Sequence, residues 1–265
     1  MKEKVRIENL QESNIDDLIH VCSGKKLTDP VHMRGVELKK HWLREMLEKY
    51  GSCAKIAFYG EKPVAQILYY PEEADITKAS RRKNVLIIQC VYNPMPEAQK
   101  RGIGTQLLRS VIQDAKNRKT PLGLSPCRFM LARAFNTGEF LSLTDFYRKN
   151  GFLPTPEENL YCLQMEAGYE SAKPVGKYKP LPEDKNKAII FYSPTCQFSY
   201  PFALRTSEII KEVAPQIEIE FVNEWEKAEE AIKRRNQWLV VNSKPIHTFF
   251  MDTDRFKTEI RQALS

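Results

Sequence analysis

The sequence lacks any apolar stretch that approaches the roughly 20 residues needed to cross a bilayer. Its first residues, MKEKVRIENLQESNIDDL, are charged, whereas a secretory leader carries an apolar segment. These absences argue against a membrane-spanning protein and give no reason to expect a membrane partner. We therefore expect the chain to be cytoplasmic.

Closely spaced cysteines are also missing. The chain has six, far apart in sequence: Cys22, Cys53, Cys90, Cys127, Cys162 and Cys196. Zinc sites and disulfide-stapled small domains use close pairs of cysteines, which this pattern does not offer. We expect reduced thiols and no metal site.

Histidine is scarce, with only His20, His32, His41 and His247. None has a second ligand at the spacing of a metal site. His20 and His41 fall in predicted helices, where packing or surface positions explain them. His32 falls in a loop that we predict over residues 23–35.

Charge of one sign does not dominate the chain, because 41 basic residues face 34 acidic ones, for a formal charge of +7. The basic residues are spread out, with short clusters at residues 81–83 and 233–235. A positive balance attracts anions, which include nucleic acid and phosphorylated cofactors. No nucleic-acid motif accompanies the charge, so we expect no nucleic-acid partner and favour a polyanionic coenzyme.

Apolar residues make up 42% of the chain and charged residues 28%, as in ordinary globular proteins. Residues 168–186, GYESAKPVGKYKPLPEDKN, hold three prolines and two glycines without helical or strand periodicity. This segment predicts a linker. We expect a first domain over residues 1–167 and a different, smaller domain over residues 187–265.

The first domain predicts the element order β-α-α-β-β-β-α-β-α-β from its hydrophobic periods and its turn residues. A hairpin is expected around Gly60, where residues 54–59 and 63–70 flank a short turn. Residues 84–92 contain VLIIQCVY, a nearly continuous apolar run that predicts a central strand buried on both faces. An amphipathic helix follows from Ile103.

Two glycines stand between the central strand and this helix, at Gly102 and Gly104. A helix start carries backbone N–H groups without internal partners and the positive end of the helix dipole. Glycines there let a phosphate approach the amides closely. A tight strand-to-helix turn with no ligand would explain the glycines as well.

The pattern Gln-x-x-Gly-x-Gly in this position resembles the pyrophosphate-binding signature of the GNAT acetyltransferases. A second similarity is FYRKNGF at residues 146–152, which resembles the tyrosine-bearing helix of that family with its Gly-Phe ending. Together these resemblances cover residues 1 to about 167. They imply a GNAT acetyltransferase fold, an α/β architecture with a mixed central sheet flanked by helices.

The resemblance also implies site residues. The coenzyme-binding set consists of Val91, Tyr92, Gln99, Lys100, Arg101, Gly102, Ile103, Gly104, Thr105 and Asn136. Backbone groups of Val91 and Tyr92 would bond the pantetheine arm where the central strand splays from its neighbour, and Asn136 would bond it too. Tyr147 would protonate the leaving thiolate, although its ring could instead simply pack in the core.

By the same resemblance, the acyl donor is acetyl-CoA and the acceptor is a primary amine, which we expect on a small molecule. The amine attacks the thioester directly, so the enzyme contributes orientation and stabilises the developing oxyanion. No general base stands out: Glu97 is near the glycines, but a lone loop glutamate is usually solvated. In the family the loop that holds His32 walls the acceptor pocket, so an acceptor contact is possible there.

The second domain predicts the order β-α-β-α-β-β-α, with a polar helix over residues 224–235 and a returning strand over residues 246–250. This order resembles the thioredoxin fold. Cys196 stands between its first strand and first helix, where that fold carries its redox thiol. Ser199 replaces the second cysteine, and no proline stands just before Trp238, where thioredoxins have a cis-proline. The whole arrangement is similar to acetyltransferases with a YoaP-like C-terminal domain.

Other functions fit parts of this pattern. The chain could be a CoA-binding or thiol-sensing regulatory protein without transfer activity, or its tail could be a monothiol reductase or thiol carrier. Cys196 could also be a buried thiol that only packs. The tail could cover the acceptor pocket or form a homodimer.

Overall fold

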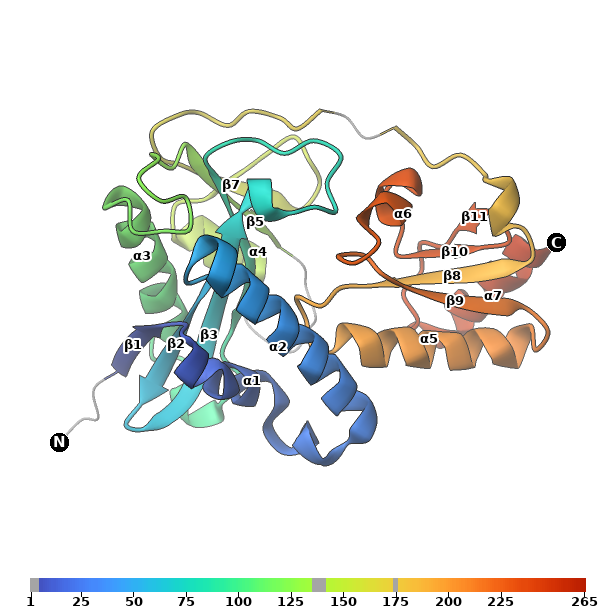
Figure 1. Cartoon of the computed structure of the whole chain (residues 1–265), viewed down its shortest axis with the longest axis horizontal. Coiled ribbons are helices and arrows are strands. Elements are labelled where there is room, and N and C mark those ends of the chain that lie inside the picture. Colours follow the sequence, from blue (N-terminus) through green and yellow to red (C-terminus); the bar gives the residue numbers. More distant parts are fainter. Residues whose placement is uncertain (1–4, 135–141, 174–175) are drawn as a thin grey trace. The chain divides into compact units, whose positions relative to one another are not determined.

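The computed structural model describes residues 5–134, 142–173 and 176–265. The chain divides into two compact units. The first consists of Met1–Lys25, Leu43–Asp75 and Ser80–Lys173, and the second of Lys26–Trp42, Ile76–Ala79 and Pro174–Ser265. Each unit has its own sheet and core (Figure 1). The domain limits predicted from the sequence stay a prediction.

The first unit is built on a mixed sheet. Its strands are β1 (Val5–Asn9), β2 (Ala54–Tyr59), β3 (Lys62–Pro71), β4 (Val85–Tyr92), β5 (Phe129–Arg133), β6 (Leu153–Pro154) and β7 (Leu160–Gln164). They lie in the order β1-β2-β3-β4-β5-β7-β6, and only the β4–β5 pair is parallel. The predicted mixed sheet, with the strand of residues 84–92 at its centre, is therefore confirmed. The short strand β6 was not predicted.

The hairpin of β2 and β3 forms as predicted, with Gly60 at φ +59° in its turn. The next pair, β3 and β4, contains a bulge: Leu68 lies opposite Cys90, while Tyr69 lies opposite Ile88. One extra residue of β4 therefore separates these positions. Bulges bend a strand and are common beside active sites.

The β4–β5 ladder is shorter than β4 itself. It pairs Val85–Ile88 with Phe129–Ala132, whereas the β3–β4 ladder continues to Tyr92. Burial follows the same division, because Val85, Leu86 and Ile88 are buried but the residues from Cys90 onward are half-buried. The prediction that this strand is buried on both faces along its whole length is thus wrong for its second half.

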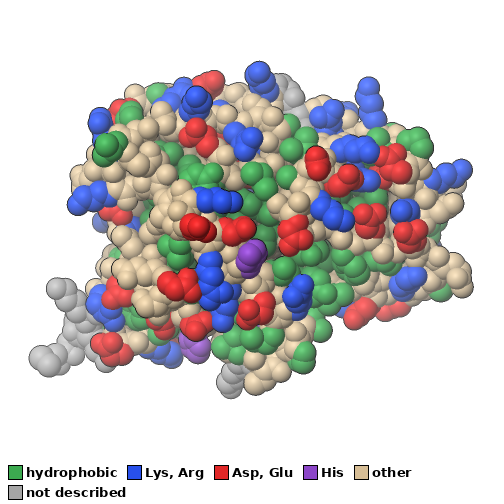
Figure 2. Space-filling view, in the orientation of Figure 1, with side chains coloured by type: hydrophobic (Ala, Val, Ile, Leu, Met, Phe, Trp, Pro, Cys, Tyr) green, Lys and Arg blue, Asp and Glu red, His purple; other side chains and the backbone are tan. Residues whose placement is uncertain are grey.

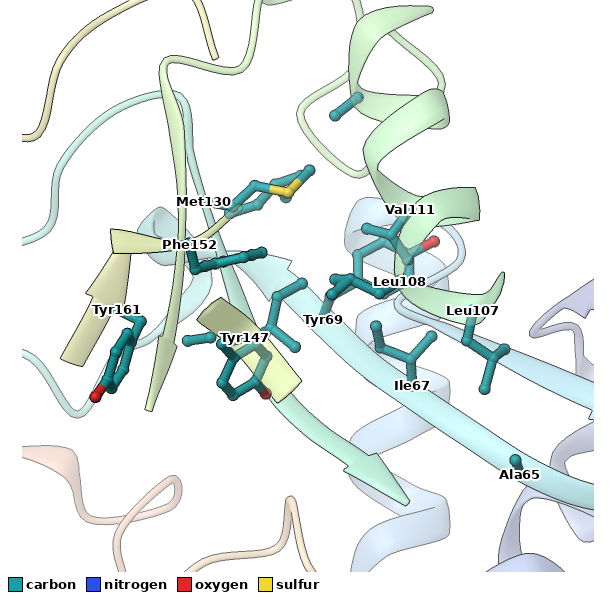
Figure 3. Close-up of a cluster of buried hydrophobic side chains, with 14 of the residues drawn as sticks. Ala65, Ile67, Tyr69, Leu107, Leu108, Val111, Met130, Tyr147, Phe152 and Tyr161 are labelled. Atoms are coloured by element: carbon teal, nitrogen blue, oxygen red, sulfur yellow. The ribbon is translucent and has the colours of Figure 1, made fainter. Parts of the chain in front are cut away.

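Four helices accompany the sheet strands in sequence: α1 (Ile15–Ser23), α2 (Pro30–Tyr50), α3 (Ile103–Lys116) and α4 (Leu143–Lys149). Side chains along β3 alternate between the two faces of the sheet, and their contacts show that α1 and α3 cover opposite faces. Ala65 and Ile67 pack with Leu107 and Leu108 of α3, whereas Gln66 bonds α1. Figure 3 shows the α3 side of this core, where Ile67, Leu108 and Val111 lie together.

The start of α2 differs from the prediction of a loop over residues 23–35. A short 3-10 helix occupies Gly24–Thr28, and α2 begins at Pro30. Asp29 caps it, since its carboxylate accepts from the backbone N–H of Val31 at 2.9 Å. Proline is favoured in the first helical turn because its missing N–H has no partner there anyway.

The second unit has a four-stranded sheet in its described residues, in the order β11-β10-β8-β9. The strands are β8 (Lys187–Tyr192), β9 (Glu218–Asn223), β10 (Leu239–Val241) and β11 (Lys244–Pro245), with helices α5 (Ser199–Val213), α6 (Ala228–Lys233) and α7 (Thr253–Leu264). The pair β8–β9 is parallel, and the other two pairs are antiparallel. The element order β-α-β-α-β-β-α agrees with the prediction (Figure 1).

Two details of this unit differ from the sequence prediction. The strand that returns after β10 ends at Pro245, and residues 246–250 are not a strand as we expected. Asn242 and Ser243, at φ +47° and +61°, form the two-residue turn typical of a tight hairpin. The predicted helix over residues 224–235 is shorter, since α6 covers only Ala228–Lys233.

Residues 26–42 of the N-terminal half belong to the second unit. Gly35 explains how they fit: a Cβ at this position would lie 2.1 Å from the carbonyl oxygen of Gln197. The helix therefore packs directly against the backbone before α5, and only glycine allows that approach. Trp42 and Trp225 add an edge-to-face ring pair at 5.3 Å.

Surface charge is mixed on the face shown in Figure 2, where basic and acidic side chains are interspersed. Within the described residues, no helix combines the length and the apolar character that crossing a membrane would need.

Candidate functional site

The glycine-bearing segment forms a sharp strand-to-helix turn. After a 3-10 turn at Pro96–Ala98, Lys100 and Gly102 adopt left-handed φ angles of +58° and +71°. Gly102 caps α3, and its carbonyl accepts the N–H of Gln106 at 3.0 Å. The amides of the first turn of a helix have no intrahelical acceptor, so this turn can bind an anion.

The side chains of the predicted coenzyme set do different things. Gln99 donates to the carbonyl oxygen of Asn93 at 3.3 Å, and Arg101 lies over the ring of Tyr59 at 4.8 Å. Ile103 is 1% exposed and packs in the core. These three side chains contact other parts of the protein, so the backbone amides of the turn are the main groups able to bind a ligand, with the exposed Lys100 beside them.

Gly104 is the second residue of α3 and lies in its first turn. A Cβ at this position would lie 3.5 Å from the ring of Phe146 and 3.8 Å from Val91. Both distances are ordinary van der Waals contacts, so the protein itself tolerates alanine here. The glycine is therefore not explained by internal packing, and a close ligand would explain it.

Val91 and Tyr92 lie at the end of β4, beyond the part that pairs with β5. Val91 faces the α3 side of the sheet, since its side chain is near Gly104 and joins the core of the first unit. The turn, the end of β4 and Phe146 of α4 therefore meet at one place. Thr105 lies in the same first turn of α3, half-buried.

Tyr147 lies in α4 with only 1% of its surface exposed. Its ring contacts Phe146 and Phe152, both at 5.3 Å between centroids, and Figure 3 shows it beside Phe152. Burial, and after it the nearby Cys90 thiol, raises the pKa of Tyr147 above its usual range. The hydroxyl is therefore protonated at neutral pH, and the raised pKa makes it a weaker acid than an exposed tyrosine.

Two other residues bear on the predicted chemistry. Asn136 lies outside the described residues. Glu97 is exposed and forms an ion pair with Lys62, and the hydrogen bond from that lysine lowers the pKa of Glu97. A carboxylate with a lowered pKa is a weak base, so Glu97 is a poor candidate to deprotonate an ammonium group.

Gln66 is a residue that sequence reasoning missed. It lies on β3 opposite Tyr92, 1% exposed, and its Nε2 donates to Cys22 Sγ at 2.9 Å. Its Oε1 is buried without a hydrogen-bond partner among the described residues. Native proteins keep few such groups, because each costs about 1–3 kcal/mol. A glutamine within the apolar run PVAQILYY was the available signal.

In the second unit, Cys196 is exposed on the turn between β8 and α5, and it is not a packed core thiol. His32 lies within α2 and not in a loop, so the expected acceptor-loop position is wrong. It is 2% exposed, with its ring 4.9 Å from that of Phe198. Burial, followed by Lys26, lowers its pKa, while Asp29 acts in the opposite direction.

All six cysteines are free thiols. Over the described ranges, His, Cys, Asp and Glu side chains form no group of three or more that could hold a metal ion.

Comparison with protein families identifies one match. Residues 23–152, just under half of the chain, match the model of the Acetyltransferase (GNAT) family. These residues include the turn at Gly102, the end of β4 and Tyr147. No curated protein matches the chain.

A comparison with solved structures finds three with related descriptions. A GNAT family acetyltransferase from Brucella melitensis in complex with acetyl-CoA is 13% identical to this chain and has a TM-score of 0.43. The similar region covers 64% of this chain and 94% of the Brucella chain. An N-acetyltransferase from Staphylococcus aureus Mu50 is 10% identical, covering 61% and 98%, with a TM-score of 0.42. The loading GNATL domain of CurA from Lyngbya majuscula is 15% identical, covering 61% and 98%, with a TM-score of 0.41.

Proposed function

We propose, on the premise that residues 23–152 carry a GNAT acetyltransferase domain, that this protein transfers an acetyl group from acetyl-CoA to a primary amine of a small molecule. Acetyl-CoA is the donor that this family uses. The N-acyl chemistry and the small amine acceptor are the specific parts of the proposal.

The observation that carries it is the turn at the start of α3. Gly102 adopts φ +71°, and Gly104 is a glycine that neighbouring side chains do not require. Bare amides at a helix N-terminus bind a pyrophosphate by charge-assisted hydrogen bonds and by the helix dipole. Lys100 and Arg101 add positive charge beside it.

The end of β4 supports the placement of the pantetheine arm. Because the ladder with β5 stops at Ile88, the strand runs on to Tyr92 along an opening in the sheet. An extended arm can bond a strand edge there as an added strand would. Val91 lies beside Gly104, so this edge and the phosphate site are continuous.

Holding the thioester along β4 lets the amine attack its carbonyl directly in a ternary complex. The enzyme supplies orientation, which converts a bimolecular reaction into an effectively unimolecular one. Backbone N–H groups near the thioester stabilise the developing oxyanion. Tyr147 then donates its hydroxyl proton to the leaving thiolate as the C–S bond breaks, and the proton that the amine nitrogen loses passes through water to the resulting tyrosinate.

Gln66 is our candidate contact for the acceptor. Its buried Oε1 can accept a hydrogen bond from an amine N–H, which would satisfy a group that otherwise lacks a partner among the described residues. It lies on the α1 face of β3, opposite Tyr92. The amine would then approach from the face of the sheet opposite α3.

For the C-terminal part we propose a thioredoxin-like, YoaP-type domain over residues 187–265, after a linker at residues 168–186 and a GNAT domain at 1–167. The parallel pair β8–β9, followed by the antiparallel strands β10 and β11, supports this fold. Cover of the acceptor pocket and dimer formation are its two candidate roles.

The proposal is tested by Gly104→Ala with calorimetric titration of CoA into the full chain. The protein tolerates the added methyl group, so the melting temperature should stay near that of the wild type. The methyl group occupies the space of the phosphate, so CoA affinity should fall at least about tenfold, the loss expected for a charge-assisted hydrogen bond. Gln106→Ala, on the exposed side of the same helix, is the control and should bind CoA normally. Unchanged affinity in Gly104→Ala would remove the basis of the proposal.

A second candidate is a CoA-binding or thiol-sensing regulatory protein, and the exposure of Cys196 favours it. Thiol release from acetyl-CoA with a panel of amines distinguishes the two functions. Cys196→Ser should leave this turnover intact if the first unit performs the chemistry. A loss of turnover in Cys196→Ser would instead favour a reaction in which the tail is the working part.

A further inference from the structure

The first unit contains a hollow between the C-terminal halves of α3 and α4. Its volume is about 370 Å³, within the range of small-molecule sites. Eight residues line it: Arg109, Ile112, Lys116, Lys149, Asn150, Leu163, Gln164 and Met165. None of them belongs to the proposed donor site.

Three of these lining residues are cations: Arg109, Lys116 and Lys149. All three are exposed, and none makes an ion pair with an acidic side chain in the described parts of the chain. Lys116 and Lys149 lie in the last turns of their helices, where a positive charge also favours the helix dipole. Arg109 lies in mid-helix, so the dipole does not explain it.

The other residues that line the hollow fall into an apolar group and a polar group. Ile112, Leu163 and Met165 are half-buried and supply an apolar floor. Asn150 and Gln164 supply amide groups beside them. Gly151 adopts φ +87°, and a Cβ at this position would lie 3.5 Å from the side chain of Leu163. An anion with an apolar, planar body matches this division.

We propose that this hollow binds a nucleoside phosphate, with its base over the apolar floor and its phosphates on Arg109, Lys116 and Lys149. Guanidinium and ammonium groups are the side chains that bind phosphate most strongly, and the guanidinium can bind two oxygens at once. The amide groups can bond the edge of the base. The inference does not depend on the proposed acetyl transfer.

The hollow is separate from the turn at Gly102. At a rise of 1.5 Å per residue, Arg109 lies about 10 Å and Lys116 about 20 Å along α3 from that turn. Asn150 caps the C-terminal end of α4, whereas Phe146, which contacts the donor turn, precedes it by one helical turn. A nucleotide here would therefore be a second ligand.

The test is calorimetric titration of ATP into the full chain at low ionic strength, with and without saturating CoA. We expect ATP to bind, and to bind equally well with CoA present. Arg109→Gln and Lys149→Gln should each weaken ATP about tenfold or more, the effect of losing one hydrogen bond to a charged group. Lys119→Gln, which removes the same charge just beyond α3 and outside the hollow, is the matched control and should bind normally.

Three results would overturn the proposal. If ATP does not bind, the hollow is not a nucleoside-phosphate site. Equal weakening by Lys119→Gln would mean that general surface charge attracts ATP. Displacement of ATP by CoA would make the hollow a part of the donor site. Melting temperatures of all variants show that each is folded, because the substituted side chains are exposed.

Discussion

At the scale of single residues, Tyr147 combines a core position with a chemical role. Its ring packs between Phe146 and Phe152, and its raised pKa keeps the hydroxyl protonated. Packing and proton donation can thus be separated by removing one oxygen atom, because phenylalanine preserves the ring contacts.

Tyr147→Phe should keep the melting temperature within about 2 °C of the wild type, because the rings stay in place; such a shift corresponds to at most about 0.5–1 kcal/mol. Its kcat should fall about 100-fold, the effect typical of a lost general acid. Thiol release from acetyl-CoA with an amine panel measures this. Tyr161→Phe, which removes a hydroxyl from the same core, is the control and should keep full turnover. Equal turnover in both variants would contradict the assignment.

Cys127 gives the first unit a dependence on alkaline pH. Burial raises the pKa of its thiol to about 12, while a thiol in the unfolded chain ionises near pH 8.5. A raised folded pKa means that the stabilisation is complete below the unfolded value and is lost as pH rises toward the folded one. The window of loss is therefore about pH 8.5 to 12.

At pH 10, ionisation of this thiol in the unfolded state should lower the free energy of unfolding by about 1–2 kcal/mol. Cys127→Ala removes the ionisation and leaves a small cavity, so its melting temperature should fall less than that of the wild type between pH 7.5 and pH 10. Val64→Ala, which only opens a cavity in the same core, should fall in parallel with the wild type. Parallel falls in all three proteins would contradict the argument.

At the scale of elements, the sequence predicted most strands and most helices because their apolar periods coincide with the buried faces. It missed the start of α2 because Asp29-Pro30 and Gly35 are typical of a loop. In the structure Asp29 caps α2 and Pro30 is its first residue. Gly35 allows the backbone of α2 to pack against Gln197. No local pattern contains that contact, which joins residues far apart in the chain.

The candidate site shows a similar limit. The turn at Gly102 follows from local chemistry, so the sequence could place it. Gln66 could not be placed, since its importance comes from lying opposite Tyr92 on a neighbouring strand. Likewise the hollow at Arg109 forms only when α3, α4 and β7 come together.

Gly35→Ala tests the packing of α2. Alanine favours a helix over glycine by about 1 kcal/mol, but its Cβ would lie 2.1 Å from a backbone oxygen. Overpacking of this kind costs about 1–3 kcal/mol, so the variant should be less stable despite its better helix propensity. Chemical denaturation followed by tryptophan fluorescence measures this. Gly104→Ala is the matched comparison, because its Cβ has room, and it should not lose stability when its melting is followed by calorimetry, which also detects the first unit.

At the scale of the whole molecule, the unfolding of the two units can be followed by different measurements. All three tryptophans, Trp42, Trp225 and Trp238, belong to the second unit. The proposed CoA site belongs to the first. Calorimetry detects the melting of both units, whereas tryptophan fluorescence detects mainly the second.

CoA at 100 times its dissociation constant should stabilise the first unit by about 2.7 kcal/mol. Its calorimetric transition should therefore rise, while the melting seen by tryptophan fluorescence should move less. Removing CoA by dialysis should restore the original transition. No rise in calorimetry would contradict CoA binding, and equal rises in both probes would contradict separate melting of the units.

The assignment of residues 26–42 to the second unit has a consequence for how the chain can be divided. A protease that cuts at residues 168–186 leaves two fragments, yet the C-terminal fragment lacks a helix that its own unit requires. Cleavage should therefore give a nicked protein whose pieces co-elute. Expressed alone, residues 187–265 should fold poorly until a peptide of residues 26–42 is added in trans.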